Sequence, residues 1–454
     1  MSRGSVKTRR RDLRLLKGDG TCWAIMTGSG DWQFVLFALA VGLSEVVSGL
    51  VATVPLLAGA VLQVLTPWGV RLVGSIRRWV YLCALFQALT LITLAVCALS
   101  GGISGWLLYM VVAVYWASGY MTGPPWITWV SSLVPDRIRA KFWVDRSRWV
   151  QGGFIVGLLA GLVLQAGEEM GRPLVAFAVV FAVAALARLV SSFLLSQQSD
   201  PEPELIDKIE MPSRASLRKH FSDRRTRGLL LYMLAFFLSI FVVAPFFGPY
   251  LREQLKFEYW QIMAITGTTF LAKVLVLPFV GRIAHRSGPG RVLWIGALVT
   301  APAAALWGVS DSFWWLLGLQ FYVGFGWACW ETGSFLLVFD VIPAERRTPV
   351  MTIYQLAQAI VMVGGSLLGA ALLEGVGVDR TGYLALFLAT SLMRFVSLFL
   401  LASLEPSGLK VRHRAKTLLV RTMGLLPGSG SVEVLLPSGE DEEGAIEDES
   451  RRDT

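Results

Sequence analysis

The chain alternates between long apolar stretches and short polar loops. Each apolar stretch has about 20 residues, the length that an α-helix needs to cross a ~30 Å hydrocarbon layer. Twelve such helices are predicted, at residues 22–41, 45–66, 79–100, 105–130, 149–166, 174–196, 228–249, 259–281, 291–309, 313–338, 350–373 and 381–402. The pattern therefore predicts an all-α integral membrane protein with twelve transmembrane helices.

The second half of the chain repeats the first. Four positions carry the same residue 208 positions later: Pro135, Arg139, Gly157 and Gly161 are matched by Pro343, Arg347, Gly365 and Gly369. Two parallel repeats in a membrane protein are typical of one large class of transporters. The repeat predicts two six-helix bundles, at 22–196 and 228–402, joined by a polar linker with three prolines at 197–227.

Positive charge is concentrated in the loops on one side of the predicted helices. These loops begin with the basic segment 1–21 and include the linker, whereas the opposite loops are short and carry few charges. Because basic loops stay in the cytoplasm, both termini are expected there. The segment 403–454 ends with eight acidic residues after Ser438 and is expected to be a largely disordered cytoplasmic tail.

The composition agrees with this interpretation. Of the 454 residues, 54% are hydrophobic and only 16% are charged, against roughly 25% charged in soluble domains. The net charge of +9 resides in short loops between apolar stretches, so it marks topology and does not indicate a nucleic-acid partner. The four cysteines and three histidines have neither metal-ligand nor catalytic spacing, so no metal, no cofactor and no enzymatic activity are expected.

Six plus six helices, a central linker and parallel halves resemble the major facilitator superfamily over residues 20–402. That family carries a Gly-x3-Asp-Arg-x-Gly-Arg-Arg type loop after its second and eighth helices. Here the second copy runs from Gly281 to Arg291, and the first, less regular copy from Pro67 to Arg78. The usual aspartate is replaced by His285 in one copy and by Arg71 in the other. The resemblance implies a monomeric secondary transporter in the cell (inner) membrane that works by alternating access.

Charged residues at membrane depth are costly and are therefore candidates for function. Asp31 lies within the first predicted helix, Lys273 within the eighth and Glu331 within the tenth. At ~1.5 Å per residue, Lys273 and Glu331 lie at similar depths, about 12–14 Å from the cytoplasmic ends of their helices, so they could pair. Asp31 or Glu331 is a candidate proton carrier. Arg188 and Arg394 lie closer to the helix ends and are expected to reach water there.

The resemblance also implies which helices line a central cavity, namely the first, fourth, seventh and tenth. The fourth and tenth are rich in aromatic residues, which suit an amphipathic organic solute better than an inorganic ion. Some of these tryptophans are also explained by an interfacial belt. The eleventh predicted helix adds two amide side chains that could bind the solute. The further candidates for the substrate or proton pathway are therefore Trp126, Gln320, Trp327, Trp330, Gln355 and Gln358.

Two further sets of residues are candidates for structural roles. Arginines of the cytoplasmic loops are expected to help close an inner gate, where they meet helix ends and acidic groups: Arg77, Arg139, Arg286, Arg291 and Arg347. Glycines at spacings of four permit close helix packing, and their equivalence in the repeat indicates packing between the halves: Gly153, Gly157, Gly161, Gly365 and Gly369.

The sequence thus predicts a secondary transporter that moves a small organic solute, with proton-coupled efflux slightly favoured over uptake. The partners expected are the solute, protons and the lipid bilayer. The alternative is a non-transporting membrane scaffold or assembly factor with the same fold, because a fold does not fix a function.

Overall fold

The structure is a computed structural model, and it describes residues 3–134, 136–200, 223–342 and 344–403. These residues form helices and connecting turns, which confirms the predicted all-α class. By length and composition, nine helical stretches of the described residues could cross a membrane. Helices also occupy the three other predicted ranges, 22–41, 105–130 and 313–338. The count of twelve transmembrane helices is consistent with this and stays a prediction.

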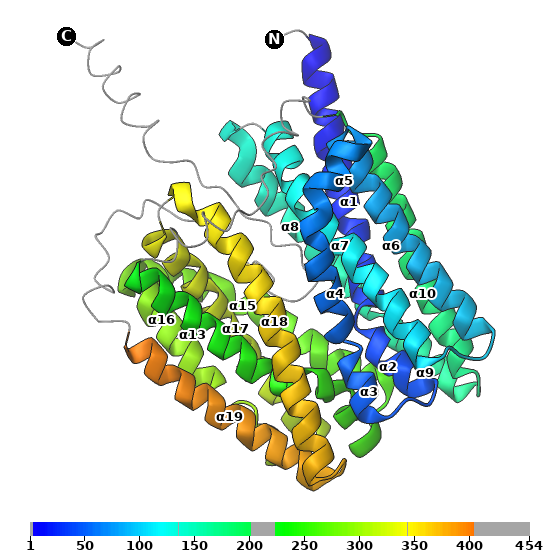
Figure 1. The fold of residues 1–454 in the computed structure, drawn as a ribbon, viewed down its shortest axis with the longest axis vertical. Coiled ribbons are helices and arrows are strands. Elements are labelled where there is room, and N and C mark those ends of the chain that lie inside the picture. Colours follow the sequence, from blue (N-terminus) through cyan, green and yellow to red (C-terminus); the bar gives the residue numbers. More distant parts are fainter. Residues whose placement is uncertain (1–2, 135, 201–222, 343, 404–454) are drawn as a thin grey trace.

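The N-terminal half forms one bundle, shown from blue to green in Figure 1. Its helices are α1 (Arg3–Gly30), α2 (Gln33–Ala40), α3 (Glu45–Leu50), α4 (Val54–Leu62), η1 (Gln63–Leu65), α5 (Thr66–Val73), α6 (Ile76–Leu99), α7 (Gly105–Leu133), α8 (Asp136–Leu158), α9 (Ala160–Glu169) and α10 (Pro173–Ser196). Within it, α1 packs against α8 and α10, and α6 packs against α7 and α10.

The C-terminal half forms the second bundle, shown from green to orange in Figure 1. Its helices are α13 (Arg224–Val243), η2 (Ala244–Phe246), α14 (Phe247–Pro249), η3 (Tyr250–Gln254), α15 (Tyr259–Ser287), α16 (Pro289–Thr300), η4 (Ala305–Gly308), α17 (Phe313–Val341), α18 (Ala344–Val376) and α19 (Arg380–Ala402). Here α17 packs against α15 and α16, and α13 packs against α18 and α19.

Local sequence explains several helix ends. The side chains of Ser75, Asp223 and Asp379 accept hydrogen bonds from the first turns of α6, α13 and α19, as N-cap residues do. The Thr226 N–H lowers the pKa of Asp223 by bonding to its carboxylate. Gly74 ends α5 in a left-handed conformation with φ of 67°, which a side chain would disfavour.

Two prolines lie inside α7 without ending it. Pro125 has no N–H, so the carbonyl of Met121, four residues earlier, loses its helical partner. The indole Nε1 of Trp79 on α6 donates to this carbonyl at 3.1 Å. The neighbouring helix thus satisfies a backbone group that would be costly to leave unpaired in a membrane.

The first helix begins much earlier than its predicted start at residue 22. It runs without a break from Arg3, and both Asp12 and Leu16 are buried where the sequence indicated only a basic tail. Asp12, Leu16 and Asp19 recur at spacings of four and three, which places them on one face of the helix. This face packs against the bundle, so most of the predicted tail belongs to the fold.

The glycines pack mainly within each bundle. A Cβ on Gly157 would lie 2.6 Å from the carbonyl oxygen of Ile25 on α1, and one on Gly365 would lie 2.7 Å from that of Leu238 on α13. Gly153 likewise meets α1, and Gly369 meets α13. The predicted packing between the halves is therefore wrong for these four positions. It holds for Gly161, which meets Met263 of the other bundle.

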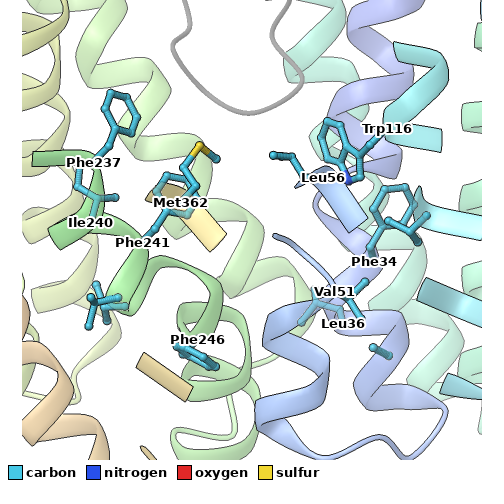
Figure 2. Close-up of a cluster of buried hydrophobic side chains, with 14 of the residues drawn as sticks. Phe34, Leu36, Val51, Leu56, Trp116, Phe237, Ile240, Phe241, Phe246 and Met362 are labelled. Atoms are coloured by element: carbon cyan, nitrogen blue, oxygen red, sulfur yellow. The ribbon is translucent and has the colours of Figure 1, made fainter. Parts of the chain in front are cut away.

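Apolar side chains from both halves belong to one buried cluster. Figure 2 shows part of it, with labelled residues from α2, α4 and α7 on one side and from α13 and α18 on the other. Large apolar side chains also remain exposed on the outside, among them Leu72, Phe86 and Phe399. A membrane supplies the apolar surroundings that such a surface needs.

The two bundles contact each other away from the end that carries the N-terminus. Figure 1 shows their helices meeting near α2, α3 and the lower part of α18, and diverging toward the N-terminus. We name the end with the N-terminus and the basic loops the basic end, and the other the opposite end. The contacts between the bundles involve α18 with α3 and α4, α14 with α2 and α3, and α15 with α9.

Candidate functional site

Helices α15 and α17 bring Lys273 and Glu331 together inside the C-terminal bundle. The Nζ of Lys273 donates to Oε1 of Glu331 at 2.6 Å. The two side chains are only 8% and 6% exposed, so the ion pair is buried. The pairing predicted from their similar depths is present. Moving a charged group from water into a protein interior costs on the order of several kcal/mol for each ion. Close pairing of the two charges offsets only part of this cost.

The second oxygen of Glu331 has no hydrogen-bond partner within the described part of the chain. This Oε2 atom is buried, although a carboxylate normally accepts several hydrogen bonds. Leaving a buried acceptor unpaired costs about 1–3 kcal/mol. Such an acceptor is available to a donor group of a solute, or to a proton.

Aromatic rings surround the ion pair and extend to the other bundle. The Nζ of Lys273 lies 5.5 Å from the ring centroid of Phe270 and 5.7 Å from that of Trp327. Phe270 in turn contacts Trp32 and Phe154 of the N-terminal bundle, with centroids 6.3 Å and 4.5 Å apart. The pair therefore lies close to the boundary between the halves.

Gln320 belongs to the same region. Its Oε1 accepts a hydrogen bond of 2.9 Å from the hydroxyl of Thr269, which precedes Lys273 by one helical turn. Gln320, Trp327 and Glu331 are spaced by seven and four residues, so they share one face of α17. The structure thus brings together Lys273, Glu331, Trp327 and Gln320, and adds Thr269 and Phe270, which the sequence analysis did not select.

Two predicted tryptophans lie elsewhere. Trp330 is fully buried inside the C-terminal bundle, stacked on Phe236 at 4.4 Å, and its Nε1 donates to the hydroxyl of Tyr232 at 3.0 Å. It is a core residue in this conformation, and its place along a solute pathway stays a prediction. Trp126 lies in the N-terminal bundle, where the guanidinium of Arg146 stands 4.9 Å from its ring.

Asp31 lies in the turn between α1 and α2, not within a helix. The hydroxyl of Tyr115 on α7 donates a hydrogen bond to its Oδ1. Asp31 directly precedes Trp32, the residue that contacts Phe270 of the other bundle. Gln355 and Gln358 are both half-buried on α18, and their role stays a prediction.

The arginines predicted to form an inner gate lie at the basic end. Arg77 donates to the carbonyl of Gln198 at 3.0 Å and lies 3.5 Å from Asp200, both in its own bundle. Arg286 and Arg291 are exposed near the junction of α15 and α16. The side chains of Arg139 and Arg347 lie outside the described part of the structure.

Arg188 and Arg394 do not reach water as expected. They are only 3% and 8% exposed, because neighbouring helices cover them. Arg394 donates to the carbonyl of Thr300 at 2.8 Å, whereas Arg188 donates to the hydroxyl of Ser191 at 2.9 Å. The helical spacing of α10 and α19 gave their depth, but it did not give which neighbour covers them.

Polar contacts join the bundles at the opposite end. Arg252 pairs with Glu168, and the two side chains are 19% and 37% exposed. Glu45 accepts hydrogen bonds from the hydroxyl of Tyr383 at 2.6 Å and from the amide of Gln254 at 2.9 Å. An ion pair and two hydrogen bonds thus hold the halves together at this end.

Comparisons with known proteins agree with the fold. The family model described as Major Facilitator Superfamily matches residues 229–426. The multi-drug resistance efflux pump PmrA homolog of Lactococcus lactis subsp. lactis (strain IL1403) is 25% identical over 368 residues, 78% of this chain and 84% of that protein. The chain is thus similar to the major facilitator superfamily in its C-terminal half, and to this curated efflux pump over most of its length. The resemblance read from its helices and loops is thereby confirmed.

Other relatives are less similar in sequence. An uncharacterized MFS-type transporter, Rv1250 of Mycobacterium tuberculosis (strain ATCC 25618 / H37Rv), is 24% identical over 177 residues, 38% of this chain and 30% of that protein. Among solved structures, the nucleoside transporter NupG aligns with a TM-score of 0.63 at 13% identity, over 86% of this chain and 99% of that one. A bacterial homolog of the lysosomal transporter Spinster, in an inward-facing conformation, gives 0.62 at 15% identity, over 89% and 97%. These structures share the fold.

Proposed function

We propose that this superfamily transporter exports amphipathic organic compounds from the cytoplasm in exchange for protons. The observation that carries the proposal is the buried Lys273–Glu331 pair, which lies next to aromatic rings. The Oε2 atom of Glu331 has no hydrogen-bond partner among the described residues. A solute with a hydrogen-bond donor or a positive charge can use that oxygen, while its apolar part packs on the rings. The alternative of a non-transporting scaffold is not favoured, since the curated relatives are named as transporters.

The direction of transport is proposed from two sources. The Lactococcus relative is named as an efflux pump. A further relative is the multidrug resistance protein 3 of Bacillus subtilis (strain 168). It is 22% identical over 184 residues, which are 40% of this chain and 36% of that protein. The positive-inside rule makes the basic end cytoplasmic. With the halves joined at the opposite end, this conformation would receive solute from the cytoplasm, and alternating access would release it outside.

A ligand screen followed by transport tests this proposal. Thermal unfolding of the purified protein is measured with cationic, neutral and anionic amphipathic compounds, since a ligand at about 100 times its Kd stabilises the folded state by about 2.7 kcal/mol. We expect cationic dyes such as ethidium to raise Tm, and Glu331→Gln to remove the effect. In proteoliposomes, an imposed pH gradient is expected to drive ethidium transport. Stabilisation without any gradient-driven or exchange transport would contradict the proposal.

The contacts at the opposite end make a separate prediction. Arg252→Gln removes an interaction between the halves worth about 1 kcal/mol, which shifts a two-state equilibrium about fivefold. The halves should then separate at the opposite end and approach at the basic end. Spin labels at Leu72→Cys and Arg282→Cys, both exposed positions, should report a larger population of short distances.

The same loop offers a matched control for Arg252→Gln. Lys256 pairs with Glu253 of its own bundle, and its side chain is 73% exposed. Lys256→Gln removes the same charge without removing an ion pair or hydrogen bond between the halves, so the distance distribution should change much less. Equal shifts in the two variants would mean that loop charge, not the Arg252–Glu168 pair, controls the conformation.

A further inference from the structure

A positive charge is buried inside the C-terminal bundle, apart from the Lys273–Glu331 pair. Arg394 lies on α19, roughly 12 Å before the end of the helix at Ala402, and it is only 8% exposed. Its Nη1 donates to the carbonyl of Thr300 at 2.8 Å. A guanidinium stays protonated in proteins, so burial cannot neutralise Arg394 as it can neutralise a lysine or a carboxyl group.

The helices around Arg394 offer it no acidic partner. α19 packs against α13, α16, α18 and η4. The sequences of α13, α16, η4 and α19 contain neither aspartate nor glutamate, and α18 has its two acids, Glu345 and Glu374, near its ends. Among the described residues, Arg394 forms no ion pair. A lone buried charge is very costly, because nothing offsets its desolvation.

The N-terminal bundle provides an acid for the equivalent arginine. Arg188, which is the repeat equivalent of Arg394, donates to the hydroxyl of Ser191 at 2.9 Å. This hydroxyl donates to Oδ1 of Asp19 on α1 at 2.6 Å. Ser397, the equivalent of Ser191, instead donates to the carbonyl of Arg394 in its own helix at 2.7 Å. Both halves therefore bury the arginine, but the described residues of the C-terminal half place no carboxylate beside it.

Two hydrogen-bond donors at this position are unused among the described residues. The Nε atom of Arg394 is buried without a partner, and so is the hydroxyl of Thr390. Thr390 is fully buried one turn before Arg394, so the two residues share one face of α19. Thr300, in contrast, uses its hydroxyl to donate to the carbonyl of Gly296 in its own helix. A guanidinium N–H and a hydroxyl are the kind of donors that bind an anion.

A helix break beside Arg394 explains part of its position. α16 ends at Thr300, and the turn at 301–304 separates it from η4. Side chains of α19 satisfy the freed backbone groups, since Arg394 donates to the carbonyl of Thr300 and Ser391 accepts from the N–H of Ala305 at 2.8 Å. A neutral amide could donate to that carbonyl equally well. The break therefore accounts for the hydrogen bond of Arg394 but not for its charge.

We propose that Arg394 and Thr390 form an internal binding site for a small monovalent anion such as chloride. The site is too well covered for an organic anion, since Thr390, Thr300 and Arg394 are 0%, 2% and 8% exposed. A halide needs donors and no acceptor, which matches the unused N–H and O–H groups. Bound there, it neutralises the guanidinium and stabilises the packing of α19 against α16.

This site is separate from the solute site. The residues expected along the solute or proton pathway lie on other helices or in the turn after α1, and none of them lies on α13, α16 or α19. The inference therefore goes beyond the proposed function and does not depend on it.

Thermal unfolding of the purified full chain in sodium chloride and in sodium gluconate, at equal ionic strength, tests the site. A ligand that binds the folded state raises Tm once its concentration exceeds its Kd. We expect the Tm of the wild type to be higher in chloride by about 3 °C or more. Arg394→Gln keeps a donor for the carbonyl of Thr300 but has no charge, so its Tm should be the same in both salts.

Two hydroxyl variants on the same helix face provide a matched comparison. Thr390→Val keeps the shape of the side chain and removes the donor, so the same rise in Tm should need about fivefold more chloride, the effect of one lost hydrogen bond. Ser397→Ala removes a hydroxyl that bonds within its own helix, so its chloride dependence should equal that of the wild type. If Arg394→Gln does not fold, Thr390→Val replaces it.

Bromide, which can replace chloride, gives a direct readout of the position. Crystals grown in sodium bromide should show its anomalous signal within hydrogen-bonding distance of Nε of Arg394. A wild type with the same Tm in both salts overturns the inference. Equal chloride dependence of the wild type and Arg394→Gln, or of the wild type and Thr390→Val, overturns it as well, and so does a water molecule in the place of bromide.

Discussion

Replacing either member of the Lys273–Glu331 pair alone is expected to destabilise the protein by about 3–5 kcal/mol, because it leaves the other charge buried without its partner. Glu331→Met strands the ammonium group of Lys273, and Lys273→Met strands the carboxylate of Glu331, whose Oε2 already has no partner among the described residues. The double variant Lys273→Met/Glu331→Met removes both charges together. It should recover most of the lost stability, since an apolar pair of similar volume is often as stable as a buried ion pair.

Transport should respond differently from stability. If Glu331 binds the solute, the double variant should fold but stay inactive. The free energy of solute binding should weaken by about 2 kcal/mol or more, which is within the range for a lost hydrogen bond to a charged group. Thermal unfolding and ethidium exchange, measured on the same preparations, check both parts. A double variant that is as unstable as the sum of the single variants would show that the two side chains act independently. A stable double variant with normal exchange would remove Glu331 from the solute site.

This pair is also the part of the site that the sequence predicted best. Helical rise gives the depth of a residue in the membrane, so two opposite charges at equal depth on helices of one bundle are expected to meet. Depth does not give the rotation of a helix about its axis. Trp330 and Trp327 lie three residues apart on α17, yet one is a core residue and the other lies beside Lys273. Trp330 is covered by Phe236 of α13 and lies against Gly296 of α16, whereas Trp327 faces the ammonium group of Lys273.

The buried charges of the N-terminal bundle were missed for a different reason. The segment before residue 22 is strongly basic, so it was interpreted as a cytoplasmic tail. Asp12, Leu16 and Asp19 are nevertheless spaced so that they lie on one face of a helix, and all three are buried. That spacing was the available signal. The glycine repeat, in contrast, correctly predicted close packing but not the partner helix, because a small residue shows that a helix approaches and not which helix it is.

Adding a methyl group at the tight glycines is expected to destabilise both bundles. Alanine is favoured over glycine inside a helix by about 0.5–1 kcal/mol, so a loss of stability must come from packing. At Gly157 the new Cβ would lie 2.6 Å from the carbonyl of Ile25 and 2.8 Å from Cα of Gly28, both in the backbone of α1. Backbone atoms cannot rotate away, so Gly157→Ala should cost about 1–3 kcal/mol, the usual range for overpacking. Gly365→Ala should behave alike, against Leu238 on α13.

Neighbouring glycines of the same helices provide the controls. A Cβ on Gly152 or on Gly364 would have nothing within 4 Å among the described residues, so Gly152→Ala and Gly364→Ala should be neutral or stabilising. Tm and the yield of monodisperse protein are measured for all four variants. The comparison distinguishes the effect of packing on stability from the effect of helix propensity. Equal losses of stability in all four variants would mean that the close approach of α1 to α8 and of α13 to α18 does not determine stability.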